Sequence, residues 1–456
     1  MDVTFFGLLT VGLGLATLTA SPAVAIYFFM FFSIANAAGT FSVGGASIPP
    51  VNLFAFFFCL RAANLPGGIS LSFDSLNPRR PGFLLACLMI LGVLSAVFYP
   101  RIFQGVTYIF YPDRDVDVRA ALQARPLVSG SGNVTQSLYA LEGLAIFAVT
   151  HAYARYVSLE TFLRAFRFLA LLNIGFAVVD VITDTLGVSF LMDPVRSGGY
   201  TIHASQMVSG IRRIIGSFPE PSAFASFSFQ MFVGAFVLWQ FRFGGRLTFF
   251  AMMGNLLAMI ISTSTTGYAA FVLFLLMVIV WLLYTLFTQG WTRMPQLAVF
   301  GLGCGLLIIA ALYAFDAVPT SVSDVLSATM NKSDSRSGIE RAAMNTQAWS
   351  NFVDTYGIGA GLGSARASSF LFVILSNVGV FGAFLFFTFV AKVLLAPPEH
   401  THVQRLTSLT AKSQMVGTLI CAGLAGGVFD LGSQFYFWCG VASALACARL
   451  PRPVFA

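Results

Sequence analysis

Charged residues are scarce in this chain. Asp, Glu, Lys and Arg together make up only 9% of the 456 residues, whereas 57% are hydrophobic and 49 are Phe. In a typical soluble domain about a quarter of the residues are charged. This shortage excludes an ordinary soluble protein and indicates a chain that crosses a membrane several times.

The strict alternation of apolar and polar residues that marks membrane β-strands is also missing, which leaves helices as the spanning elements. The run 49–60 contains Pro49 and Pro50 and is short, so it is either re-entrant or a thin span. We expect an all-α polytopic membrane protein with about 12–13 transmembrane helices in one domain, residues 1–456. Runs of about 17–25 apolar residues, the length that crosses a bilayer, fall near 3–20, 22–39, 83–99, 135–153, 166–190, 221–240, 247–263, 267–287, 296–315, 369–395, 413–429 and 431–448.

Paired cysteine motifs are missing as well. All six cysteines lie in apolar runs without CxxC spacing, which is typical of small core residues and not of disulfides or metal ligands. His203 is the only histidine in a predicted outer loop, and a lone histidine there is weak support for a catalytic base. We find no internal repeat that predicts an inverted-repeat transporter.

Arginine and lysine are concentrated in alternate short loops, as expected when these loops face the cytoplasm. The three longest loops, 100–134, 191–219 and 316–368, then lie on the outer face, where binding and catalysis are usually placed. Orientation signals and an anionic ligand account for the net charge of +7, so we do not expect a nucleic acid partner. The basic loops carry Arg79, Arg80, Arg155, Arg164, Arg167, Arg242, Arg246, Arg293, Lys392, Arg405 and Lys412.

Three arginines stand on the outer side, where positive charge is normally sparse: Arg196, Arg212 and Arg213. Glu220 and Pro221 follow at the start of a predicted helix. Arginine stays charged and offers a planar fork of donors suited to phosphate, so this cluster predicts a diphosphate site. Alternatively, the arginines extend to lipid headgroups and the glutamate caps the helix.

The long outer loop 316–368 holds a second cluster. Arg336, Glu340 and Arg341 fall on one side of a predicted helix. Four glycines at alternate positions follow, which allow the backbone to approach a ligand closely, and Arg366 comes directly after them. No Walker motif is present, so the glycine run is equally consistent with an ordinary loop that re-enters the membrane domain.

Two smaller signals complete the set of candidates. The short outward turn from Ser262 to Tyr268 is rich in hydroxyl groups, which either bind sugar or satisfy the ends of the flanking helices. Asp180 and Asp184 lie four residues apart in one span, an arrangement that can form a proton or cation site.

Several of these residues form motifs that follow one another over roughly residues 205–385. In this order they resemble the O-antigen ligase/polymerase superfamily, the group of Wzy-type polysaccharide polymerases and WaaL-type ligases, and its exopolysaccharide polymerase branch in particular. The ligases carry a histidine in the long outer loop, where this chain has Ala367-Ser368-Ser369. The motifs are Arg213-x-x-Gly216-x-Phe218-x-Glu220-Pro221-Ser222, Ser262-x-Ser264-x-x-Gly267-Tyr268, Arg341 with Gly357-Ile-Gly359-x-Gly361-Leu-Gly363-Ser-x-Arg366, and Asn377-x-Gly379-x-x-Gly382.

The resemblance implies a GT-C-like helical fold in the bacterial inner membrane, with the active site facing the periplasm and the loop 316–368 carrying part of it. The implied reaction transfers an undecaprenyl-diphosphate-linked glycan to the acceptor hydroxyl of another lipid-linked repeat unit, without a metal or other cofactor. A chain-length regulator and a flippase are the implied protein partners. Two other functions remain open: a ligase-like transfer of finished glycan, and transport of the lipid-linked oligosaccharide as in a flippase.

The family pattern places Arg213 and Arg341 on the departing diphosphate as catalytic residues. We expect Glu220 to act as the base, because a partly buried carboxylate has its pKa raised toward the working range. Asp334 and Glu340 are the alternatives for this role. Further substrate contacts are expected from Arg196, Arg212, Arg336, Arg366 and Tyr268.

Overall fold

The computed structural model describes residues 2–43, 46–110, 124–199, 202, 206–208, 211–289, 336–397 and 401–446. Helices dominate this part of the chain. They are α1 (Phe5–Thr19), α2 (Pro22–Ile34), α3 (Pro50–Ala63), α4 (Gly68–Asp74), α5 (Pro81–Ile102), α6 (Ser131–Tyr156), α7 (Leu159–Thr185), the 3₁₀ helix η1 (Ser189–Arg196), α8 (Pro221–Gln240), α9 (Gly245–Ile261), α10 (Thr265–Gln289), α13 (Arg336–Asp354), α14 (Phe370–Leu394), α15 (His402–Ala425) and α16 (Ser433–Leu445).

The strands are short and lie in the connections between helices. In all three small sheets the strands pair antiparallel, and in the last of them Met207 lies opposite Arg212. The strands are β1 (Asp2–Val3), β2 (Phe41–Val43) and β3 (Ala46–Ser47) in one sheet, β4 (Tyr108–Phe110) and β5 (Ala124–Pro126) in the second, and β6 (Met207–Val208) and β7 (Ile211–Arg212) in the third.

Among the described residues, five helices are long and apolar enough to cross a membrane: α5, α7, α8, α10 and α14. Helices α3 and α4 pass the same test together but are bent by 109° at the break between them, so a broken span and a re-entrant segment both fit the run 49–60. Helices α1, α2 and α9 are apolar but shorter. The all-α multi-pass class is therefore confirmed, whereas the number of 12–13 spans stays a prediction, in part because the run 296–315 lies outside the described residues.

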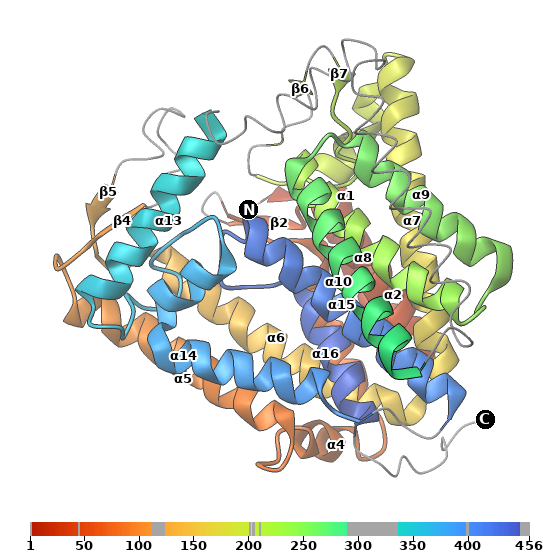
Figure 1. Ribbon diagram of the computed structural model, residues 1–456, viewed down its shortest axis with the longest axis horizontal. Helices are drawn as coiled ribbons and strands as arrows, with labels where there is room; N and C mark the ends of the chain where they lie inside the picture. Colours follow the sequence, from red (N-terminus) through yellow and green to blue (C-terminus); the bar gives the residue numbers. More distant parts are fainter. Residues whose placement is uncertain are drawn as a thin grey trace.

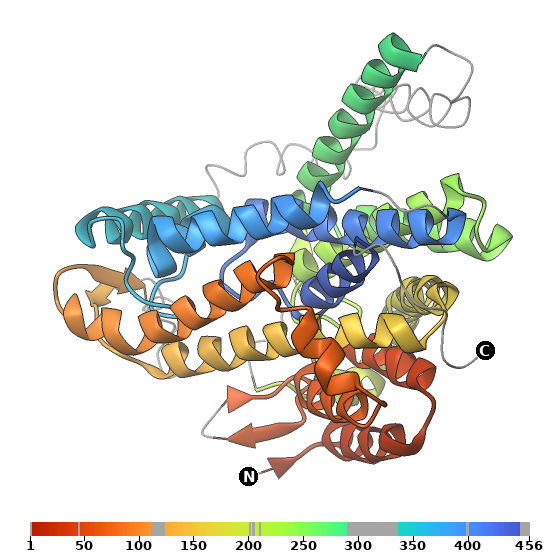
Figure 2. The same cartoon turned by 90° about the horizontal axis from the view of Figure 1, so that it is seen from below.

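The helices pack in two groups that share α16 (Figure 1). Helices α5, α6 and α14 lie side by side in one group, and α8 is packed against α9, α10 and α15 in the other. Aromatic rings fill the core between α2, α3 and α16, where Phe29 stacks on both Phe58 and Phe437. Figure 2 shows that α10 projects away from the other helices.

The basic loops that the structure describes meet at one end of the helices, which we call the basic end. Arg80 contacts His151 at the end of α6, and Arg167 lies over the ring of Phe243. The opposite end, the loop end, carries the connections between α7 and α8, between α9 and α10, and between α13 and α14. This separation agrees with the predicted orientation, in which the basic loops face the cytoplasm.

Candidate functional site

Arg213 follows strand β7 at the loop end and is held by oxygen atoms from two segments. Its Nε lies 3.2 Å from the carbonyl oxygen of Ser262, and its Nη2 lies 3.2 Å from that of Thr263. Its Nη1 donates to Oε1 of Gln206 at 3.1 Å. Ser262 and Thr263 form the turn between α9 and α10, so the structure brings two separately predicted clusters together.

Three further side chains act electrostatically on the Arg213 guanidinium: Glu220, Tyr268 and Arg341. We call these four residues the arginine cluster. Burial lowers the pKa of Arg213 from its usual range and the positive charge of Arg341 adds to this effect, whereas Glu220 and Tyr268 oppose it. Two neighbouring cations repel each other, and an anion placed between them relieves the repulsion.

Asp180 in α7 fixes the segment that precedes α8. Its Oδ1 lies 2.6 Å from Nη2 of Arg196 and 2.9 Å from Nη2 of Arg212. Its Oδ2 accepts backbone hydrogen bonds from Ile215 at 3.0 Å and Gly216 at 2.9 Å. The side chain is fully buried, and a buried carboxylate is tolerated because it is paired and hydrogen-bonded in this way.

The charges of Arg196 and Arg212 are therefore compensated within the protein. Arg196 also donates to the carbonyl oxygen of Gly216 at 2.9 Å, and Nε of Arg212 lies 3.3 Å from Oδ1 of Asp184. These contacts give both arginines a positioning role, and their contact with substrate stays a prediction. The two guanidinium groups stand where a cation would bind Asp180, so the alternative of a cation site at this carboxylate is wrong.

Glu220 occupies the N-cap position of α8, but its side chain is exposed, so the expectation of a partly buried carboxylate is wrong. Its side chain makes no cap hydrogen bond to the backbone of α8, and the hydroxyl of Ser222 donates to the carboxylate instead. The exposed carboxylate is accessible to a substrate and remains close enough to act on Arg213.

The other predicted residues take different positions. Arg341 is half-buried in the first part of α13, and the hydroxyl of Tyr268 donates to the carbonyl oxygen of Ile260 at 2.7 Å. Arg336 is the first residue of α13, and its side chain lies outside the described part of the structure, as does the whole of Asp334. Arg366 is exposed in the connection between α13 and α14.

The glycine run is a structural loop, as the alternative interpretation predicted. All four of its glycines have positive φ. A Cβ atom at Gly359 would lie 2.7 Å from the carbonyl oxygen of Asn377, and one at Gly363 would lie 2.3 Å from that of Gly132. The N–H of Gly363 donates to Oδ1 of Asn377 at 2.8 Å. The close approach that these glycines permit is therefore to other parts of the protein and not to a ligand.

A polar cavity of about 330 Å³ opens at the start of α8. Phe218 and Ala223, which flank Glu220 in the sequence, belong to its wall. Sequence reasoning missed this cavity, although a carboxylate within or beside an apolar run, such as Glu142 or Asp430, is a signal for a functional site. Its polar lining includes Asn36, Asn52, Tyr139, Gln230, Asp430, Ser433 and Gln434, from α2, α3, α6, α8, α16 and the connections that follow α2 and α15.

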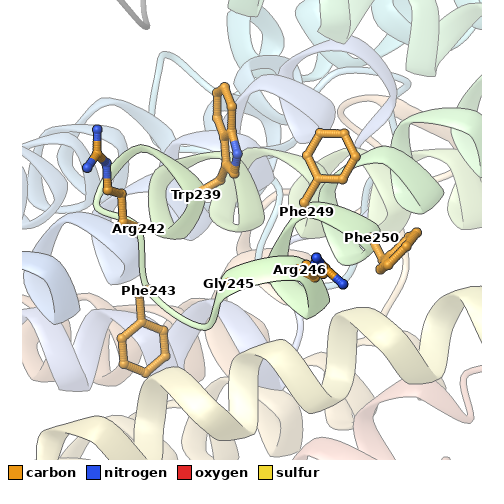
Figure 3. A pocket seen from close by; sticks show the side chains of 7 residues that line it. All are labelled: Trp239, Arg242, Phe243, Gly245, Arg246, Phe249 and Phe250. Carbon is orange, nitrogen blue, oxygen red and sulfur yellow. The ribbon is translucent and has the colours of Figure 1, made fainter.

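A second hollow, of about 380 Å³, lies at the basic end in the turn between α8 and α9 (Figure 3). The guanidinium groups of Arg242 and Arg246 point in different directions, and Phe243 points away from Trp239 and Phe249 (Figure 3). Arginines with aromatic neighbours in this arrangement are typical of a membrane interface and do not converge on a reacting group. This hollow is therefore not the catalytic site.

Within the described residues, no group of three or more His, Cys, Asp and Glu side chains is placed to hold a metal ion. The sequence Asp113-Arg114-Asp115-Val116-Asp117 in the outer loop 100–134 lies outside the described part of the chain. Alternating aspartates of this kind are oxygen ligands suited to a divalent cation. The expectation of a reaction without metal thus stays a prediction.

Comparison of the chain with known protein families, with curated proteins and with solved structures gave no match in any of the three. The resemblance to the O-antigen ligase/polymerase superfamily stays a prediction, and the proposal for a function is based on the geometry of the arginine cluster.

Proposed function

We propose that this protein is a membrane glycosyltransferase of the O-antigen ligase/polymerase type, which polymerises a polysaccharide. It transfers an undecaprenyl-diphosphate-linked glycan to the acceptor hydroxyl of another lipid-linked repeat unit, on the periplasmic face of a bacterial inner membrane. The observation that carries the proposal is the arginine cluster. Two guanidinium groups from segments far apart in the sequence act on each other beside an exposed carboxylate.

The electrostatics of the cluster favour a doubly phosphorylated ligand. An arginine in apolar surroundings costs about 2.5–3.5 kcal/mol on insertion scales, and two arginines near each other add their mutual repulsion. A diphosphate offsets both costs, because it offers several oxygens to planar donor groups. Arg213 is already held in place by Ser262 and Thr263, so its charge does not have to be reoriented when the ligand arrives.

The proposed reaction is a single displacement at the anomeric carbon of the donor glycan. The acceptor hydroxyl oxygen forms a new bond to this carbon, the bond from the carbon to the diphosphate oxygen breaks, and the electron pair leaves with the diphosphate. Arg213 and Arg341 stabilise the charge that builds up on the leaving group. A preorganised donor of this kind increases the reaction rate by a factor of about 10²–10³.

Glu220 is the residue proposed to accept the proton of the attacking hydroxyl. Its carboxylate is exposed at the loop end and lies within electrostatic reach of Arg213. An alternative role, in which Glu220 only stabilises the charge of Arg213, makes a different prediction for substrate binding. Glu220→Gln is expected to lower turnover more than lipid binding if it is the base, and to lower both equally if it is structural.

The decisive experiment uses the full chain, purified in detergent and incubated with a lipid-linked repeat unit. A polymerase produces a ladder of lengths on a gel. A ligase moves finished glycan to a different acceptor and gives no ladder. A flippase needs a sealed vesicle and gives no product in detergent at all.

Arg213→Ala and Arg341→Ala are expected to abolish the ladder while the protein still inserts into the membrane. Arg246→Ala is the matched control, because this arginine lies at the basic end, away from the arginine cluster. A ladder of unchanged length from either of the first two variants would reject the role of that arginine. Failure of the unmodified protein to make a ladder with any lipid-linked glycan of its host would overturn the proposed function.

A further inference from the structure

The lining of the polar cavity at the start of α8 differs from that expected of a site for an anion or a lipid chain. Its volume of about 330 Å³ falls within the range of about 300–1,000 Å³ that is typical of small-ligand sites. Asp430 contributes a carboxylate, and amide or hydroxyl groups come from Asn52, Gln230, Ser433 and Gln434. The carboxylate repels a phosphate, and this number of polar groups is unsuited to an acyl or prenyl chain.

A second carboxyl group, that of Glu142, contacts two residues of the cavity wall without lining the cavity itself. Glu142 in α6 accepts a hydrogen bond from Nδ2 of Asn52 at 2.9 Å and is approached by Oγ of Ser433 at 3.4 Å. Asp430 acts electrostatically on Glu142, and its own Oδ1 accepts the N–H of Gly432 at 3.0 Å. Like charges in partly buried positions destabilise the fold, and donors supplied by a ligand offset this cost.

Aromatic rings form the apolar part of the same wall. Phe218 and Phe227 both line the cavity, with their ring centroids 4.9 Å apart. The combination of flat aromatic faces with carboxylate and amide groups suits a sugar ring, because the ring offers apolar C–H faces and a rim of hydroxyl donors. Among the described residues, no group of three His, Cys, Asp or Glu side chains is placed here to hold a metal ion.

We propose that the polar cavity is a carbohydrate-binding subsite, in which the carboxylate of Asp430 accepts hydrogen bonds from sugar hydroxyl groups. Its assignment to the acceptor glycan depends on the proposed function, whereas its affinity for a saccharide does not. The wall residues Phe218 and Ala223 flank Glu220, so an acceptor chain in the cavity leads toward the carboxylate that takes its proton. Groups of opposite charge thus bind the two substrates: the arginine cluster binds the diphosphate, and the carboxylate of Asp430 binds the acceptor sugar.

Binding can be measured without catalysis. The probe is the water-soluble oligosaccharide that mild acid releases from the lipid-diphosphate pool of the cells that make the protein. Its affinity for the full chain in detergent is measured by titration calorimetry. The unmodified protein is expected to bind it, and Asp430→Asn is expected to weaken binding at least about tenfold, since a charged acceptor is replaced by a neutral amide.

A second variant changes the cavity from another element. Ser226 lines the cavity from α8, and Ser226→Phe fills part of the space, so it is expected to weaken binding at least as much as Asp430→Asn. Arg213→Ala and Asp193→Asn are expected to leave the affinity within about twofold. Asp193 is an exposed carboxylate on η1 that does not line the cavity, which makes it the matched control for the loss of charge.

The two proposals fail in different ways. Unchanged saccharide affinity in Asp430→Asn and Ser226→Phe, or a loss in Arg213→Ala as large as in those two variants, would overturn the subsite. The subsite is also overturned if the unmodified protein makes a glycan ladder but does not bind the free oligosaccharide. Saccharide binding by a protein that makes no ladder would instead overturn the proposed reaction and leave the subsite standing. Thermal melting of each variant shows whether a loss of binding is only a loss of fold.

Discussion

Oδ1 of Asp180 lies 2.6 Å from Nη2 of Arg196, and neither side chain is more than 8% exposed. This pair connects α7 to the end of η1, and the same carboxylate holds the backbone in front of α8. The loop that carries Arg213 is therefore held against α7 by an ion pair that takes no part in the proposed chemistry.

Asp180→Ala is expected to destabilise the protein by about 3–5 kcal/mol, because it leaves two arginines without their buried partner. Asp184→Ala is the matched control, since this carboxylate lies one turn further along the same helix, is 41% exposed and contacts Arg212 at 3.3 Å. Its loss is expected to cost less than about 1 kcal/mol. Thermal unfolding in detergent compares the two. Equal losses of melting temperature would show that Asp180 is not the anchor of this loop.

Arg213→Lys separates charge from geometry at the arginine cluster. Lysine keeps the positive charge but cannot reach the oxygens of Ser262, Thr263 and Gln206 together with a planar fork of donors. We expect the rate of polymer formation to fall to a value between those of the unmodified protein and Arg213→Ala. Initial rates in detergent with a saturating lipid-linked donor measure this. A rate equal to that of the alanine variant would mean that geometry alone matters, and full activity would mean that charge alone does.

Gly379→Ala tests the contact between the glycine run and α14. Gly379 has φ +66° within α14, and a Cβ atom there would lie 2.3 Å from the carbonyl oxygens of Gly357 and Ile358. Both the positive φ and the lack of room for a Cβ atom exclude a side chain at this position. The variant is therefore expected to unfold at a clearly lower temperature than the unmodified protein. Gly175→Ala in α7 is the control, because nothing lies within 4 Å of its Cβ position. A similar melting temperature for the two variants would contradict this assignment.

The sequence indicated which residues lie on the outer side of the membrane, but it did not indicate which of them contact one another. Arg213 and the hydroxyl-rich turn were recognised separately, because 49 residues separate Arg213 from Ser262 and no local pattern records their contact. The outer arginines were expected to face a ligand, yet Asp180 compensates the charges of two of them, Arg196 and Arg212. The burial expected for Glu220 was wrong, since its side chain is exposed at the N-cap of α8 and makes no cap hydrogen bond to the helix backbone.

The multi-pass helical class was predictable because composition and run length depend only on local sequence. The polar cavity was not predictable, because its wall is assembled from five helices and from three connections between elements. Asp430 is separated from Asn52 by most of the chain. Only the tertiary fold places such residues together, although the carboxylate of Asp430 beside an apolar run is unusual in the sequence.

The stability of the fold is expected to depend on pH through Asp430. Burial raises the pKa of this carboxyl to about 6, above the value of about 3.9 in an unfolded chain. The folded state therefore holds the proton more tightly, so this contribution is fully present below about pH 4 and is lost as the pH rises through 6. Glu142 from α6 and Tyr436 from α16 are the titratable groups that act on it or are acted on by it.

Asp430→Asn removes the charge at every pH. The variant is expected to melt at a higher temperature than the unmodified protein at pH 7.5 and by a much smaller margin at pH 4.5, whereas the exposed control Asp193→Asn shows no such pH-dependent gain. A gain of equal size at both pH values would mean that the charge of Asp430 is not the cause. If the variant is more stable and yet binds saccharide more weakly, the carboxylate is retained at a cost to the fold because the ligand requires it.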